Sequence, residues 1–264
     1  MSCGSRALLP EAERKRLAAR GQIIDPGPRQ RQQELARRCY PGPAAVNLRL
    51  ALLFSMRHIT AADIKSFERI YRLNLVNGLP GFKPANLIGT AAPDGATNLA
   101  VFSSALHLGS DPPLLGIVTR PTTVPRHTYQ NLKSTGCYTL NHVPVARAAQ
   151  AHYTSADFGA EISEFDACGF TAAYRDDFPA PYVAESPLSI GLRLLEELSI
   201  SNGTVLLVGT VEHVYLHEAG LRPDGTLDLV GLGDACISGL DGYHEVLPPV
   251  RFGYARPGQL PAAQ

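Results

Sequence analysis

The chain has 264 residues and a formal net charge of zero, with 45% hydrophobic and 18% charged residues. A chain of this size and composition can bury a full-sized core, and its balanced charge favours neither a nucleic acid nor a membrane surface as a partner. The five cysteines form no C-x-x-C pair, so the sequence indicates neither a disulfide framework nor a zinc site. No apolar run reaches the roughly 18 residues that a membrane-spanning helix needs, and we expect a soluble, cytoplasmic protein.

Charge divides the chain into two differently composed parts. Residues 1–55 hold ten Lys+Arg and four Asp+Glu, a net charge of +6, which leaves −6 on residues 56–264. The first part has little apolar periodicity, and we interpret it as a disordered basic extension, or as the product of a mis-set start with Met56 as the true first residue. A basic arm for an acidic partner is the alternative. We expect the folded domain to span residues 56–264.

The first predicted elements are a helix and three strands. Thr60 and Asp63 resemble a capping box, and apolar residues at helical spacing predict one amphipathic helix through about Arg72. Short apolar or alternating segments separated by turn residues then predict strands. These strands lie at residues 87–91, 97–103 and 114–119.

The second half of the domain is predicted to contain another short helix and further strands. Pro125 at a first-turn position and Gly136 as a stop predict a short helix, followed by a strand at residues 137–142. Helix-prone turns span about residues 144–169. After the turn residues Asn202 and Gly203, the clearest strand of the sequence covers residues 204–215, and a further strand is expected at 226–230.

This succession of short strands predicts a mainly β fold with peripheral helices. The strands recur at intervals of about ten residues and show no regular β-α-β alternation. A closed or half-closed β-barrel with helices packed outside it is therefore expected.

The loop at residues 120–128 is the most informative for function, because Arg and Thr side chains there precede a helix. A helix N-terminus presents unpaired backbone N–H groups and the positive end of its dipole, so a phosphate is a suitable ligand. Arg120 and Arg126 can add guanidinium groups. In the alternative interpretation, Thr123 is a plain N-cap and both arginines are solvated surface charges.

The strand at residues 97–103 becomes small and polar where it ends, at Ser103 and Ser104. A flat aromatic ligand such as a flavin ring needs hydrogen-bonding partners on one edge and hydrocarbon on the other, which such a strand end can supply. A simple turn is the alternative. The sequence does not support three other kinds of site. The Gly231-Leu232-Gly233 sequence lacks the third glycine of a dinucleotide-binding fingerprint, and neither the H-E-x-x-H motif of a zinc site nor the G-x-S-x-G motif of a serine nucleophile occurs. We expect no metal site.

Five motifs follow one another along the domain. They are Asn98-Leu99-Ala100-Val101-Phe102-Ser103-Ser104, Asp111-Pro112-Pro113-Leu114, Arg126-His127-Thr128-Tyr129-Gln130-Asn131, Tyr138-Thr139-Leu140-Asn141 and Glu164-Phe165-Asp166-Ala167-Cys168-Gly169. In order and spacing they resemble the flavin-reductase-like family over roughly residues 60–260. The resemblance implies an FMN-binding split β-barrel with Greek-key connections, usually assembled as a homodimer.

The resemblance also implies roles for particular residues. Those expected to face the polar edge of the flavin ring are Asn98, Ala100, Phe102, Ser103 and Ser104. Those expected to hold the phosphate are Arg120, Thr122, Arg126, His127 and Thr128. The chain has Arg126-His127 where Lys-Asp is common in the family, which keeps one cation and removes an acid beside an anion.

The activity implied is NAD(P)H-dependent reduction of flavin, with electrons passed to free flavin or to another acceptor, including a partner protein. The chemistry is centred on the flavin, so we assign no catalytic side chain. Two alternatives remain open, a flavoredoxin-type electron carrier and a non-catalytic flavin-binding module.

Overall fold

The structure, a computed structural model of the chain, describes residues 56–263. The expectations for residues 1–55 lie outside the described part. The chain divides into two units, Met1–Lys65 and Ser66–Gln264, which are described separately. In the first unit, the capping box at the start of α4 (Ala61–Ser66) is confirmed, because Thr60 N donates to Asp63 Oδ2 at 2.8 Å and Asp63 N donates to Thr60 Oγ1 at 3.1 Å.

The second unit begins with a separate helix, α5 (Arg69–Gly78), so the prediction of one helix through Arg72 is wrong. The backbone of Glu68 is extended, with φ −54° and ψ 147°. Its carboxylate accepts hydrogen bonds from Ile70 N at 2.8 Å and Tyr71 N at 3.2 Å. Glu68 therefore ends any continuous helix and caps a new one, a role that the apolar periodicity does not reveal.

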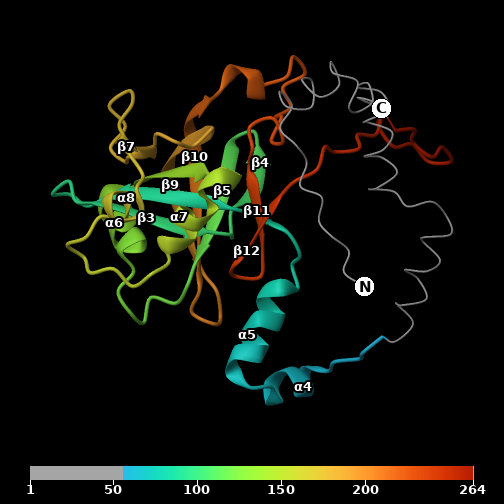
Figure 1. Cartoon of the computed structure of the whole chain (residues 1–264), viewed down its shortest axis with the longest axis horizontal. Helices are drawn as coiled ribbons and strands as arrows, with labels where there is room; N and C mark the ends of the chain where they lie inside the picture. The colour runs from blue at the N-terminus through green and yellow to red at the C-terminus, as the bar shows by residue number, and fades with distance from the viewer. Residues whose placement is uncertain (1–55, 264) are drawn as a thin grey trace, which may run out of the picture. The chain divides into compact units, whose positions relative to one another are not determined.

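A seven-stranded sheet forms the body of this unit (Figure 1). Every neighbouring pair is antiparallel. The strands, in spatial order, are β3 (Thr97–Phe102), β2 (Asn86–Ala91), β6 (Cys137–His142), β9 (Leu188–Ser199), β10 (Val205–Leu216), β5 (Pro113–Thr119) and β4 (Leu106–Ser110).

The strand order confirms the mainly β fold and the Greek-key character of its connections. β3 and β4 follow one another in the chain yet form opposite edges of the sheet, and β5 and β6 are separated in the sheet by β9 and β10. The sheet is not closed by a pairing of its two edge strands, so the half-closed form of the expected barrel is the one observed.

Two smaller sheets and the helices complete the unit. β1 (Lys83–Pro84), β11 (Ala235–Ser238) and β12 (Gly242–Glu245) form one sheet, and β7 (Ala172–Ala173) pairs with β8 (Tyr182–Val183). The helices are α6 (His127–Thr135), α7 (Ala148–Tyr153) and α8 (Glu164–Cys168), with 3-10 turns at Val145–Arg147 and Glu218–Gly220.

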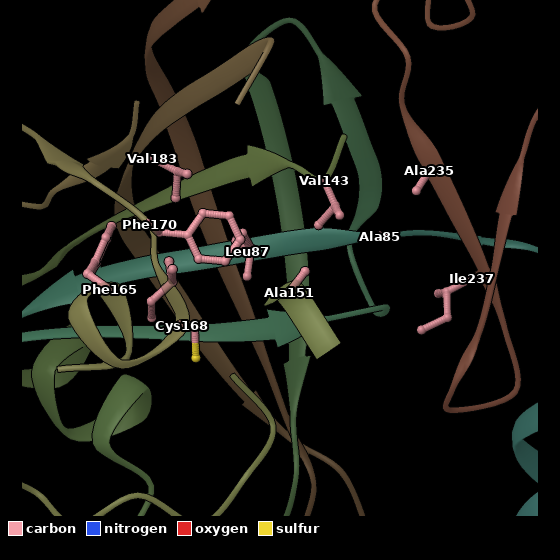
Figure 2. Close-up of a cluster of buried hydrophobic side chains, with 11 residues drawn as sticks. Ala85, Leu87, Val143, Ala151, Phe165, Cys168, Phe170, Val183, Ala235 and Ile237 are labelled. Carbon is pink, nitrogen blue, oxygen red and sulfur yellow. The ribbon is translucent and has the colours of Figure 1, made fainter. Parts of the chain in front are cut away.

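Alternation along β2 places its apolar side chains in two cores, as the two-residue period of a strand requires. Leu87 packs with Phe165 and Phe170 on one face (Figure 2). Ile88 packs with Ile117 and other residues on the opposite face. The sheet is therefore buried on both sides at β2, and all six residues of that strand are buried.

One predicted strand is not observed, and some observed strands were not predicted. Residues 226–230 contribute only an isolated bridge, Leu221 to Leu227, and otherwise form turns. The edge strand β4 and the long strand β9 were not predicted. The stop at Gly136 is confirmed, since this residue has φ 70° and its N–H donates to Leu132 O at 2.9 Å.

Candidate functional site

A pocket of about 390 Å³ lies along β3. Its other walls come from the end of β5, the first residues of α6, the loop at residues 154–158, Glu164 of α8 and the turn between β11 and β12. The predicted site residues that line it are Asn98, Ala100, Phe102, Ser103, Ser104, Arg120, Arg126, His127 and Thr128. Thr122 does not line the pocket and is exposed in the loop before α6.

Side chains cap the outer edge of β3, so the strand that lines the pocket is held in place without another strand beside it. Leu99 N donates to Glu164 Oε2 at 2.9 Å, and Val101 N donates to Thr154 Oγ1 at 2.9 Å. The Thr154 hydroxyl in turn donates to Ala151 O at 2.8 Å. These bonds satisfy backbone groups that an edge strand otherwise leaves open to pairing.

Two further contacts join β3 to the elements across the pocket. Asn98 Nδ2 donates to Thr128 Oγ1 at 2.9 Å, which connects β3 to the first turn of α6. Beyond the end of β3, Ser104 Oγ donates to Val118 O at 2.9 Å and accepts from Val118 N at 3.1 Å. A single hydroxyl thus bridges the gap between the end of β3 and strand β5.

The start of α6 presents hydrogen-bond donors without partners among the described residues. Its N-cap is Arg126, whose backbone is extended and whose side chain makes no capping hydrogen bond. Within the described residues, the Nε atom of Arg126 is buried and has no hydrogen-bond partner. Buried donors without a partner are rare in native proteins, and a helix N-terminus adds unpaired N–H groups. Pro125 precedes the N-cap instead of occupying the first turn, and Thr123 is not the N-cap.

One acidic residue of the pocket, Glu164, is bound by the backbone of β3. Glu164 is only 6% exposed, and one of its oxygens is held by Leu99 N. Burial, with a smaller contribution from the Glu164 carboxylate, raises the pKa of the Cys168 thiol to about 11. Cys168 is therefore a protonated core residue at neutral pH, and thiolate chemistry at this position is not favoured.

Among residues 56–263, no group of three or more His, Cys, Asp or Glu side chains is arranged to hold a metal ion. The helices within the same range are too short or too polar for any of them to cross a membrane.

Several pocket residues were not predicted from the sequence. They are Asn77, Val101, Val118, Thr119, Pro125, Thr154, Ser155, Ala156, Asp157, Phe158, Glu164, Thr204 and Leu240. Glu164 belongs to the Glu-Phe-x-x-x-Gly motif that the sequence displays, and Thr204 follows a recognisable hairpin turn, so those two carried a signal. Asn77 carried none. Leu240 lies in residues 239–244, which resemble the C-terminal segment of the family, but no site role was predicted for it.

The chain is similar to known proteins in sequence and in fold. Residues 82–229 match the model of the flavin reductase like domain. A protein of Shewanella frigidimarina NCIMB 400, described as a flavin reductase with a split barrel domain, is 42% identical, with a TM-score of 0.73 over 76% of this chain and 100% of that one.

Two more distant structures share the fold. Component B of nitrilotriacetate monooxygenase from Bacillus cereus is 17% identical, with a TM-score of 0.67 over 75% of this chain and 98% of that one. The flavoredoxin of Desulfovibrio vulgaris (Miyazaki F) is 24% identical, with a TM-score of 0.57 over 67% and 92%. The family match covers more than half of the chain, and its fold is that of the split-barrel neighbours. The chain belongs to the flavin reductase-like family, whose members point to a flavin-related oxidoreductase.

Proposed function

We propose that this chain binds FMN in the pocket along β3 and catalyses NAD(P)H-dependent reduction of flavin, with electrons passed to free flavin or another acceptor. The observation that carries the proposal is the buried, unpartnered Nε of Arg126 at the N-terminus of α6. A phosphate placed there satisfies this donor and the open N–H groups of the helix. When bound, FMN would supply the redox chemistry of hydride transfer from a nicotinamide and electron transfer to an acceptor.

At the phosphate end, Arg126 and the backbone of the first turn of α6 supply the donors. His127 and Thr128 are in that turn, and the Asn98 amide fixes the Thr128 hydroxyl. Arg120 lines the same pocket but is exposed, so we assign it a weaker, longer-range contribution. We assign no phosphate contact to Thr122, which does not line the pocket.

At the ring end, β3 presents small side chains to the pocket. Ala100 and Ser103 leave room for a flat ring to approach the backbone, and the polar groups of this segment can hydrogen-bond its carbonyl- and N–H-bearing edge. Any hydrogen-bond donor near the ring would also stabilise negative charge on its reduced form, although the outward N–H groups of Leu99 and Val101 are already bound to Glu164 and Thr154. The bond between Ser104 and Val118 holds the end of this segment.

Support for the proposal comes from the family and from the 42% identity to the split-barrel protein of Shewanella frigidimarina. The flavoredoxin likeness favours a second candidate, in which the chain carries electrons between protein partners. A non-catalytic flavin-binding module is the third.

We also propose that the protein is a cytoplasmic homodimer and that its folded domain starts near Met56. Exposed apolar side chains at Leu79 and Phe82 support the dimer, and light scattering that gives a monomer at micromolar concentration would contradict it.

The test is the visible absorbance spectrum of the purified protein with FMN, recorded anaerobically before and after NADH and then NADPH. Loss of the oxidised flavin bands on addition of either nicotinamide supports the reductase and identifies its donor. Bound FMN that neither nicotinamide reduces favours the carrier or the binding module. Absence of FMN binding refutes all three.

A further inference from the structure

Lys83 ties together two segments that are distant in the chain. Its Nζ donates to Asn77 O at 3.3 Å, in the last turn of α5, and to Gly239 O at 2.9 Å, in the turn between β11 and β12. The side chain is partly buried. The last carbonyls of a helix lack intrahelical donors and carry the negative end of its dipole. An ammonium group is therefore well suited to the Asn77 carbonyl.

Both tied segments contribute to the pocket. Asn77 and Leu240, which immediately follows Gly239, line it, and we call these two residues the end wall. Gly239 has φ 60°, a conformation that glycine adopts without strain. Since β1 pairs with β11 only over Lys83–Ile237 and Pro84–Cys236, the ammonium extends this short pairing to the turn that carries Leu240.

The strand pairings indicate that the end wall lies beyond the end of β3 that is farther from α6, since β11 runs from Ala235, next to Ala85, to Ile237, which pairs with Lys83. Asn98, at the start of β3, is bonded to Thr128 of α6. Phe102 is four residues on, about 13 Å along the strand, and pairs with Asn86. The residue before Asn86 is Ala85, whose N–H donates to Ala235 O of β11 at 3.4 Å. A ligand whose phosphate lies at α6 and whose body follows β3 thus extends toward the end wall.

We propose that Lys83 is a positioning residue that holds the end wall against the ring of the bound flavin. This inference rests on the proposed function. The ammonium itself does not contact the phosphate, and its effect passes through Asn77 and Leu240. Its loss should therefore weaken binding of any flavin, with or without a phosphate, by the same factor.

The test compares FMN with riboflavin, which has the same ring and no phosphate. For Lys83→Met, which keeps the length of the side chain and removes its donors, we expect the Kd of both flavins to rise by the same factor. The rise should be at most about tenfold, because the lost hydrogen bonds lie within the protein and act on the ligand only through the end wall. Lys83→Arg restores donors to the same carbonyls and should recover most of the affinity. The visible bands of bound FMN should shift in Lys83→Met and return in Lys83→Arg, because the ring is what the end wall touches.

Lys133→Met is the matched control. Lys133 pairs with Glu197 at 2.7 Å, does not line the pocket and is half exposed, so both Kd values should stay at the wild-type level. Unchanged affinity in Lys83→Met, or a loss confined to FMN, overturns the inference. If Lys83→Met does not fold, Leu240→Ala decides, with equal weakening for both flavins in support and wild-type affinity against. Wild-type protein that binds neither flavin refutes the proposed function as well, whereas wild-type binding without a Lys83 effect refutes this inference alone.

Discussion

Replacing Arg126 by alanine should weaken FMN binding and leave riboflavin binding unchanged. The Nε donor of Arg126 is buried and has no hydrogen-bond partner in the described part of the chain, so a phosphate at the start of α6 gains a charge-assisted hydrogen bond. Hydrogen bonds to charged groups contribute about 1.5–3 kcal/mol, which corresponds to an increase in the Kd for FMN of about 10- to 150-fold.

Arg120→Ala provides the matched comparison, because Arg120 lines the same pocket but is exposed. An exposed charge contributes about 1 kcal/mol or less, so its loss should raise the Kd for FMN by less than about fivefold. Its effect should also fade with added salt, since the Debye length falls to about 3 Å at 1 M. Isothermal titration calorimetry with both flavins measures each value. Wild-type FMN affinity in Arg126→Ala, or an equal loss for riboflavin, refutes the assignment of the phosphate to α6.

Three further predictions concern stability and domain organisation. Glu164→Ala should lower the free energy of unfolding by about 1–3 kcal/mol in urea titrations, because Leu99 N loses its partner in a buried site. Glu164→Gln keeps an acceptor oxygen, so its free energy of unfolding should fall by less. Wild-type stability in both variants would contradict this. The hydrogen bond from Lys133, with a second from Tyr129, holds the pKa of Glu197 below its ordinary value of 4.5. The contribution of ionised Glu197 to the free energy of unfolding is therefore complete above pH 4.5 and is lost as the pH falls through the lower folded-state pKa. Acid should therefore destabilise the wild type more than Glu197→Gln, and parallel stability curves for the two proteins below pH 4.5 would argue against this. A chain that begins at Met56 should keep its folding and its FMN affinity, whereas an insoluble product would show that residues 1–55 are required.

Elements with local signals were predictable from the sequence. The capping box at Thr60 and the helix stop at Gly136 each depend on residues within one helical turn. The strand β6 was predicted at residues 137–142, and these are the limits observed. The β10 strand carries a run of β-branched residues after a hairpin turn, which is a strong local pattern.

Elements set by distant partners were not predictable in this way. β9 includes Arg193, Glu196 and Glu197, and its register is fixed by pairing with β6 and β10 on either side. The expected strand at residues 226–230 has suitable residues but forms only the bridge between Leu221 and Leu227. A segment with high strand propensity forms a strand only where another segment pairs with it, and propensity does not predict that partner.

The site shows the same division. The sequence marks β3 and the start of α6 because small, hydroxyl and basic residues cluster there. The end wall was not inferred, because the folded chain brings Asn77 and Leu240 to one pocket from segments distant in the sequence, both of which Lys83 contacts. Thr122 shows the opposite error, since a residue between two pocket-lining segments in the chain lies outside the pocket itself.

The most direct test of the central claim is a crystal structure of the protein with FMN. We expect the phosphate at the N-terminus of α6 within hydrogen-bond distance of Arg126, and the ring along β3 between Ala100 and the end wall. Density for FMN elsewhere on the chain, or a phosphate that does not contact the first turn of α6, would contradict the account.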